Sequence, residues 1–197
     1  MTTVTLASQS AARAQLLAAA GVPFTTMVAG VDEDALKAGL LAEGLSPRDI
    51  ADALAEAKAV RVSARRTGLV IGADQTLDLD GALYDKARTP AEARERLLVL
   101  RGKTHKLHSA VVVAQDGQPI WREVEAASLR MRPFTDAFVE DYLRRQASVV
   151  LSSVGCYQLE GEGLQLFDRI EGDYFTILGL PMLGLLDLLR RYEVLEP

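Results

Sequence analysis

Polar residues near the start of the chain have types suited to binding a phosphate group. They form the segment Ser8-Gln9-Ser10-Ala11-Ala12-Arg13, at the junction between a predicted strand and a predicted helix. A helix N-terminus offers free backbone N–H groups, and the serine hydroxyls and the Arg13 guanidinium could converge there on an anion. The structural alternative is that Ser10 only caps the helix and that Arg13 is solvated.

Carboxylates at two further places could act on such a ligand. Asp74 follows the uncharged segment 69–73, which predicts a buried strand, and the end of such a strand is where α/β folds place ligands. Gly72, just before it, permits close approach of another backbone. The acidic cluster Asp32-Glu33-Asp34 could supply oxygen ligands for Mg²⁺. Taken alone, Asp74 also fits a turn and the cluster also fits a helix start.

Two lysines are also candidates, because a phosphate-binding site would need further cations. Lys58 follows Leu54 by about one helical turn, beside an apolar stripe, so its ammonium either reaches out to water or points into a cleft. Lys86 comes shortly after the Asp80-Gly81 dipeptide, on a connection where an exposed lysine needs no special explanation.

Other reactive residue types are less informative. His105 and His108 are three positions apart in a predicted strand, so they point to opposite faces and make a poor metal pair. Cys156 reads as a small buried thiol rather than a nucleophile. The sequence has no Walker loop, Rossmann fingerprint or nucleophile elbow, which removes the commonest phosphate-binding architectures.

The elements that must position these residues alternate along the chain. Strands are predicted at residues 4–7, 22–28, 69–73, 77–79, 104–114, 120–131 and 164–170. Helices are predicted before Gly21, after Asp34, from Pro47 to about Arg66, from Pro90 to Gly102, from Thr135 to about Arg145, and after Pro181. The dipeptides Asp80-Gly81 and Asp116-Gly117 favour tight hairpins. This order predicts an α/β fold with a mixed sheet.

Composition describes an ordinary folded protein. The chain has 197 residues, of which 49% are hydrophobic and 25% charged, and no linker or repeat divides it, so residues 1–197 are treated as one domain. Its formal net charge of −5 argues against coating nucleic acid or an anionic membrane. A single cysteine excludes an internal disulfide, and the sequence shows neither a signal peptide nor an apolar run of about 18 residues, so a cytoplasmic protein is expected.

Several motifs, taken in order, resemble the Maf family of nucleoside triphosphate pyrophosphatases over nearly the whole chain. They are Leu6-Ala7-Ser8-Gln9-Ser10-Ala11-Ala12-Arg13, Val31-Asp32-Glu33, Lys58, Ile71-Gly72-Ala73-Asp74, Lys86, Gly102-Lys103-Thr104-His105 and Gly179-Leu180-Pro181. The resemblance implies an elongated α/β fold with a central cleft, often a homodimer. It also implies cleavage of a nucleoside triphosphate between its α- and β-phosphates, with Mg²⁺ or Mn²⁺ as cofactor.

Carried over by position, the resemblance assigns a role to each candidate residue. Ser8 and Arg13 would hold phosphate oxygens, Lys58 and Lys86 would neutralise the triphosphate, Glu33 would bind metal or position water, and Asp74 would be general base and metal ligand. These residue types suit the chemistry, because a charged phosphoryl centre repels hydroxide unless cations offset its charge. The family often has Pro-Arg-Arg where this chain has Ala11-Ala12-Arg13, so only Arg13 can take the phosphate role.

Two further positions bear on the choice of nucleotide. Gln75, and Glu160 with the segment that follows it, resemble the branch of the family that prefers 7-methyl-GTP, whereas members acting on dTTP and UTP tend to have Gln at the position of Glu160. A carboxylate only accepts hydrogen bonds, which matches the N–H donors of a guanine edge. The alternative is that Glu160 is a surface residue and backbone groups read the base.

Other functions stay open at this point. They are dTTP or UTP hydrolysis, removal of deaminated purine triphosphates, and a non-catalytic nucleotide-binding regulator of cell division on the same fold. Nucleic-acid binding is disfavoured, because the basic residues are scattered among acids without a series of aromatic side chains.

Overall fold

The structure of the chain is a computed structural model that describes residues 2–196. Its strands are Val4–Leu6 (β1), Thr25–Thr26 (β2), Leu69–Leu79 (β3), Ala82–Tyr84 (β4), Thr104–Gln115 (β5), Gln118–Met131 (β6) and Phe167–Glu171 (β7). Its helices are Ala11–Ala19 (α1), Glu33–Ala42 (α2), Pro47–Ser63 (α3), Pro90–Leu100 (α4), Asp136–Arg145 (α5), Tyr174–Ile177 (α6) and Met182–Arg191 (α7), with a 3₁₀ helix at Glu162–Leu166 (η1).

The strands form one mixed sheet, as the sequence predicts. Its order is β2-β1-β3-β5-β6-β7, and β4 pairs with β3. β1 runs parallel to β2 and β3, whereas the remaining pairs are antiparallel. The α/β fold class is therefore confirmed.

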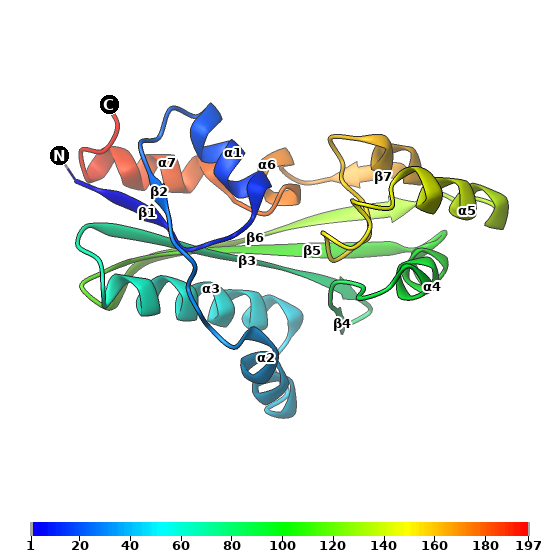
Figure 1. The fold of residues 1–197 in the computed structure, drawn as a ribbon, viewed down its shortest axis with the longest axis horizontal. Helices are drawn as coiled ribbons and strands as arrows, with labels where there is room; N and C mark the ends of the chain where they lie inside the picture. Colours follow the sequence, from blue (N-terminus) through cyan, green and yellow to red (C-terminus); the bar gives the residue numbers. More distant parts are fainter. Residues whose placement is uncertain (1, 197) are drawn as a thin grey trace.

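The sheet forms the spine of an elongated molecule (Figure 1). α3 covers one face, where its alanines pack on small residues of β5. α1 and α7 cover the opposite face near the two chain termini, where their leucines pack on β1 and β3. α4 and α5 lie at the other end of the molecule, over a separate apolar cluster. Helices thus shield both faces of the central strand β3.

One edge of β3 is only partly paired. β1 pairs with residues 69–71 of β3, and β4 pairs with residues 77–79. β5 occupies the other edge from Val70 to Asp78, so β1 and β4 must both lie on the same side. Residues 72–76 therefore have a free edge between the two short strands, which we call the edge gap. Because strand side chains alternate, side chains from both faces of β3 can reach this gap.

The predicted end of the strand at Ala73 is wrong. β3 continues to Leu79 without interruption, so Asp74 lies in the middle of a strand and not at its C-terminal end. The physical reason is that β5 provides hydrogen-bond partners along almost the whole length of β3.

Two other predicted strands are shorter than expected. The segment 22–28 contains only the two exposed residues of β2, because Pro23 lacks an N–H group and the segment lies at the sheet edge, where it pairs with β1 alone among residues 2–196. The segment 164–170 begins as η1 and becomes a strand only at Phe167. At Gly163 the chain passes so close to Gln158 that an added Cβ would lie 2.9 Å from Gln158 N, which is a turn geometry.

The local signals are accurate at most other element ends. Ser46, Thr89 and Thr135 each cap a helix through the side-chain oxygen. Asp80-Gly81 and Asp116-Gly117 form the two hairpin turns, and all four residues have positive φ, as such turns require.

The short helix α6 has no counterpart among the helices that the sequence predicts. No helix within residues 2–196 has the length and apolar character to cross a membrane.

Candidate active site

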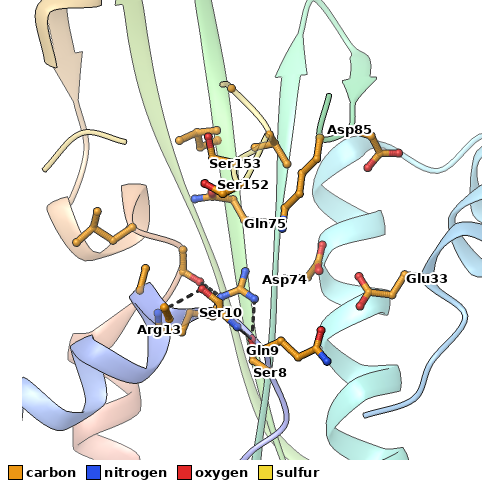
Figure 2. A pocket seen from close by; sticks show the side chains of 18 of the residues that line it. Ser8, Gln9, Ser10, Arg13, Glu33, Asp74, Gln75, Asp85, Ser152 and Ser153 are labelled. Atoms are coloured by element: carbon orange, nitrogen blue, oxygen red, sulfur yellow. Dashed lines mark hydrogen bonds between the residues drawn. The ribbon is translucent and has the colours of Figure 1, made fainter. Parts of the chain in front are cut away.

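A cleft of about 1070 Å³ opens at the edge gap. Ligand pockets of small-molecule enzymes have volumes of about 300–1,000 Å³, so its size suits a nucleotide. Figure 2 shows Ser10 and Arg13 on one side of this cleft, Glu33 and Asp85 on the other side, and Ser152 and Ser153 on a further loop. All eight residues singled out from the sequence line this cleft: Ser8, Arg13, Glu33, Lys58, Asp74, Gln75, Lys86 and Glu160.

Lys58 connects the two carboxylates predicted to do the chemistry. Its Nζ lies 2.6 Å from Asp74 Oδ1 and 2.9 Å from Glu33 Oε2. Lys58 and Asp74 are buried, whereas the Glu33 side chain is 45% exposed at the mouth of the cleft. The ammonium therefore points into the cleft and does not reach out to bulk water, the other outcome that the sequence left open.

Close packing of α3 on β3 brings this group together. Gly72 has no side chain, and a Cβ built there would lie 2.6 Å from Ala59 N and would also overlap Ala55 O. α3 can approach β3 only because that Cβ is absent. Thr76 Oγ1 donates to Pro47 O at 2.8 Å and fixes the start of the same helix. Lys58 consequently projects from α3 directly onto the neighbouring strand residue Asp74.

Arg13 is held at the floor of the cleft by backbone carbonyls. Its Nη1 donates to Ala73 O at 2.9 Å and its Nε donates to Gly179 O at 2.8 Å. Nη1 also lies 3.3 Å from Ser8 Oγ. Burial lowers the pKa of Arg13 below its usual value, which the negative charges of Asp74 and Glu33 oppose. The guanidinium is thus a braced group and not a solvated one, so that alternative is wrong.

Ser10 and Asp32 cap the N-termini of α1 and α2, as the sequence also allowed. Ser10 Oγ accepts from Arg13 N at 3.4 Å at the start of α1. Asp32 Oδ1 accepts from Ala35 N at 3.0 Å and so caps α2. Glu33, the next residue, is the first residue of that helix and is the member of the acidic cluster that contacts Lys58.

Gln75 lies on the face of β3 opposite to Asp74. Its Nε2 donates to Thr176 O at 3.1 Å and to Ile177 O at 3.0 Å, and it lies 2.9 Å from Ser109 Oγ. Two of these partners are carbonyl oxygens, which only accept, so the amide nitrogen must face them. The NH₂ group of Gln75 therefore fastens the end of α6 to the sheet, and Oε1 is left as the acceptor end of the side chain.

The two remaining candidates lie at the rim of the cleft. Lys86 is exposed on the connection between β4 and α4, and Glu160 is exposed on the loop before η1. Both are surface residues that line the cleft, and the role of each in binding a ligand stays a prediction.

The charges of the cleft nearly balance. Its acidic lining residues are Asp32, Glu33, Asp34, Asp74, Asp85 and Glu160, and its basic ones are Arg13, Lys37, Lys58, Lys86 and Arg88. Six carboxylates against five cations leave no surplus of positive charge for a polyanionic ligand. A triphosphate in this cleft would need further positive charge.

The carboxylates fit a divalent cation such as Mg²⁺. Glu33 and Asp74 each place an oxygen within hydrogen-bond distance of Lys58 Nζ, so both carboxylates border the same part of the cleft. Within residues 2–196 no three His, Cys, Asp or Glu side chains form a complete metal cage. Mg²⁺ does not need one, because it is usually bound by one or two carboxylates together with water and substrate phosphates.

The weaker candidates have structural roles. His105 Nε2 lies 2.7 Å from Tyr157 Oη, whereas His108 Nε2 lies 3.1 Å from Asp78 Oδ2, so the two histidines do not share a site. Cys156 is buried, and burial raises the pKa of its thiol to about 11, which disfavours a thiolate nucleophile. The separation of the two histidines and the burial of the thiol are confirmed.

Comparison with known proteins now identifies the family. A family model described as Maf-like protein matches residues 3–192. The chain belongs to the Maf-like family. A nucleoside triphosphate pyrophosphatase of Caulobacter vibrioides is 67% identical to this Maf-like chain over 99% of the chain and 98% of the relative. A protein of the same name from Sphingopyxis alaskensis is 53% identical over 95% and 96%.

A third relative has a more specific name. The 7-methyl-GTP pyrophosphatase of Brucella abortus is 48% identical to the Maf-like chain over 97% of the chain and 96% of the relative. Relatives with both names thus cover almost the full length of the chain.

The structure adds residues in and behind the cleft that the sequence analysis missed. Lys37 and Asp85 line the cleft and form an ion pair at its rim, whereas Ser109 and Thr176 lie behind the cleft lining and hold Gln75. Lys37 follows Glu33 by four residues, a spacing that places both on one helix face, so this signal was present in the sequence. The partners of Gln75 are distant in sequence and carry no such signal.

Proposed function

We propose that this Maf-like protein hydrolyses a nucleoside triphosphate between its α- and β-phosphates, releasing a nucleoside monophosphate and pyrophosphate. The observation that carries the proposal is the Glu33–Lys58–Asp74 cluster at the edge gap, in a cleft of nucleotide size. The names of the Caulobacter and Sphingopyxis relatives support the same reaction.

Water is the nucleophile in this reaction, and Asp74 is the group that activates it. A water oxygen attacks the α-phosphorus, the bond from that phosphorus to the bridging oxygen breaks, and the electron pair leaves with pyrophosphate. Asp74 accepts the proton of the attacking water as general base. Its Oδ1 is hydrogen-bonded to Lys58, so its second carboxylate oxygen is the one that faces the water.

The cationic side chains offset the charge of the phosphates. Arg13, braced on Ala73 and Gly179, and Ser8 beside it bind phosphate oxygens at the floor of the cleft. Lys58 and Lys86 approach from the α3 side and from the β4–α4 connection. Glu33 and Asp74 would hold a divalent cation, Mg²⁺ or Mn²⁺, which supplies charge neutralisation and Lewis acidity when bound. The near balance of charge in the cleft supports this need.

We further propose that the preferred base is guanine, with 7-methyl-GTP as the leading substrate. Glu160 presents a carboxylate, and Gln75 keeps only Oε1 for a ligand because its NH₂ group is used by the protein. Both groups accept hydrogen bonds, which matches the N–H donors of guanine better than the edges of uracil or thymine. The name of the Brucella relative supports this choice.

A substrate panel tests both levels of the proposal. The purified full chain is incubated with 7-methyl-GTP, GTP, dTTP, UTP and inosine triphosphate, with Mg²⁺ or with a chelator, and both products are quantified. We expect equal amounts of monophosphate and pyrophosphate, only with metal, and fastest with 7-methyl-GTP. Release of single phosphate, or turnover in the chelator, would contradict the reaction proposed. A clear preference for dTTP and UTP would overturn only the base assignment, and binding without turnover would favour a regulator.

A further inference from the structure

The helix that carries Glu33 is not held by the core. α2 contains no buried residue and lies at the periphery, against α3 (Figure 1). Burial of an apolar face normally fixes a helix in place, and α2 lacks that source of stability. The position of Glu33, the first residue of α2, therefore depends on contacts of another kind.

Lys37 supplies such a contact at the rim of the cleft. It lies one turn after Glu33 on the same helix, and its ammonium forms an ion pair with Asp85. The Lys37 side chain is only 13% exposed, whereas Asp85 is 55% exposed, so the ammonium is shielded from water although its carboxylate partner is not. A second pair joins Asp34 to Arg88, but both of these side chains are more than three-quarters exposed and add little.

Asp85 is itself a fixed point. Arg96 of α4 donates from Nη1 to Asp85 O at 2.5 Å and to Val154 O at 2.7 Å. Asp85 directly precedes Lys86, so the position of the Asp85 backbone also determines the position of the Lys86 backbone. The ion pair thus connects a loosely packed helix, which carries Glu33, to an anchored loop, which carries Lys86.

We propose that the Lys37–Asp85 ion pair is a positioning device that sets the separation between Glu33 and Lys86 across the cleft. Neither residue of the pair takes part in the bond changes. The pair acts through Glu33 and Lys86, so this inference rests on the proposed function. It makes Asp85, an acidic residue in a cleft for a polyanion, favourable for turnover.

The direction in which Asp85→Asn changes KM and kcat distinguishes this positioning role from a purely electrostatic one. Asp85→Asn removes a negative charge from the cleft, so electrostatics alone predicts a lower KM for the triphosphate and an unchanged kcat. Positioning predicts the opposite, a fall in kcat of about fivefold, because the loosened helix no longer holds Glu33 in place. Lys37→Met is expected to lower kcat by a similar factor.

A readout that does not depend on activity accompanies the kinetics. Hydrogen exchange of the amides of residues 33–42 is measured in the full chain, in both single variants and in the charge-swapped double variant K37D/D85K. In both single variants the amides of α2 should exchange faster than in the wild type. The charge-swapped double variant should recover slow hydrogen exchange and most of kcat. Glu140→Gln, which removes the Arg94–Glu140 pair between α4 and α5 away from the cleft, is the matched control and should change neither.

The outcomes distinguish the possible errors. Unchanged exchange and unchanged kcat in Asp85→Asn overturn the positioning role. If K37D/D85K recovers slow exchange but stays as slow as Lys37→Met in turnover, then Lys37 contacts the triphosphate directly and the proposal is wrong. If the wild-type chain releases no pyrophosphate while its single variants exchange faster, the proposed function fails and the ion pair still fixes α2.

Discussion

Asp74 has an environment that keeps a strand carboxylate available for chemistry. Lys58 stabilises its negative charge from α3, and Asp74 lines the cleft that opens at the edge gap. Lys58 also contacts Glu33, so its ammonium would keep one partner if Asp74 lost its charge. A buried cation that retains a carboxylate partner is far less destabilising than one left alone.

Substituting Asp74 therefore tests catalysis with little effect on folding. Asp74→Asn keeps the size of the side chain, and its amide can still contact the cleft, but it cannot take a proton from water. We expect turnover to fall by about 10²–10⁴-fold, the usual contribution of a general base. Pyrophosphate release measures the loss, and the thermal unfolding midpoint shows that the fold is kept.

Asp78→Asn is the matched control for this variant. Asp78 lies on the same strand, does not line the cleft, and accepts from Gly81 N at 2.7 Å through an oxygen that the amide retains. Its turnover should stay within a few-fold of the wild type. Near wild-type turnover in Asp74→Asn would remove Asp74 from the mechanism.

At the scale of elements, the contact between α3 and β3 decides where Lys58 lies. At Gly72 the backbone of α3 lies against the strand, with no room for a side chain between them. Lys58 lies among Ala55 and Ala59, the residues that an added Cβ would meet, so a shift of the helix at this point would move the ammonium as well.

Gly72→Ala should therefore destabilise the protein and impair the site together. The new Cβ would overlap Ala55 O and lie 2.8 Å from Ala59 Cβ, so α3 must move outward. Overpacking of this kind costs about 1–3 kcal/mol in the free energy of unfolding. Urea unfolding followed by circular dichroism measures the change, and pyrophosphate release should fall in the same variant under conditions where it is folded.

Gly39→Ala makes the same substitution where there is room. Gly39 lies within α2, and no atom is within 4 Å of a Cβ built there. Alanine is the better helix former by up to about 1 kcal/mol, so this variant should be slightly more stable than the wild type. Equal stability of the two glycine variants would show that α3 does not depend on the absence of a side chain at Gly72.

At the scale of the whole molecule, sequence signals predict elements better than they predict the cleft. Thr135 caps α5 and Asp80-Gly81 turns the β3–β4 hairpin because these are local preferences of a few residues. The edge gap has no local signal, since it arises from where β1 and β4 end along β3. The extent of β3 itself was underestimated because its pairing with β5 is long-range.

The candidate site shows the same division. Residue types and the family resemblance together indicated eight residues, and all eight line one cleft. Their interactions could not be predicted in the same way: Lys37 and Asp85 are separated by 48 residues, and Gln75 meets the carbonyls of a helix that the sequence did not indicate. The homodimer and the metal implied by the resemblance stay predictions, the first open to light scattering on the purified chain.

The far end of the molecule carries a pH-dependent contribution to stability. His105 is 1% exposed, its Nδ1 is buried without a partner in the part of the chain that the structure describes, and Tyr157 occupies its Nε2. Burial lowers the pKa of His105 to about 4 in the folded protein, against about 6.5 in an unfolded chain. The unfolded chain therefore binds more protons than the folded one between these two values.

Acidification through this range should destabilise the protein. Because the unfolded state takes up the extra proton, the contribution of His105 is fully present above about pH 6.5 and is lost as the pH falls toward 4, amounting to about 2 kcal/mol between pH 7 and pH 5. Urea unfolding of the wild type and of His105→Gln at both pH values isolates the effect, because all other titrating groups are common to the two proteins. The free energy of unfolding should fall more steeply with acid in the wild type, and parallel pH dependences would show that His105 does not control the acid stability of the fold.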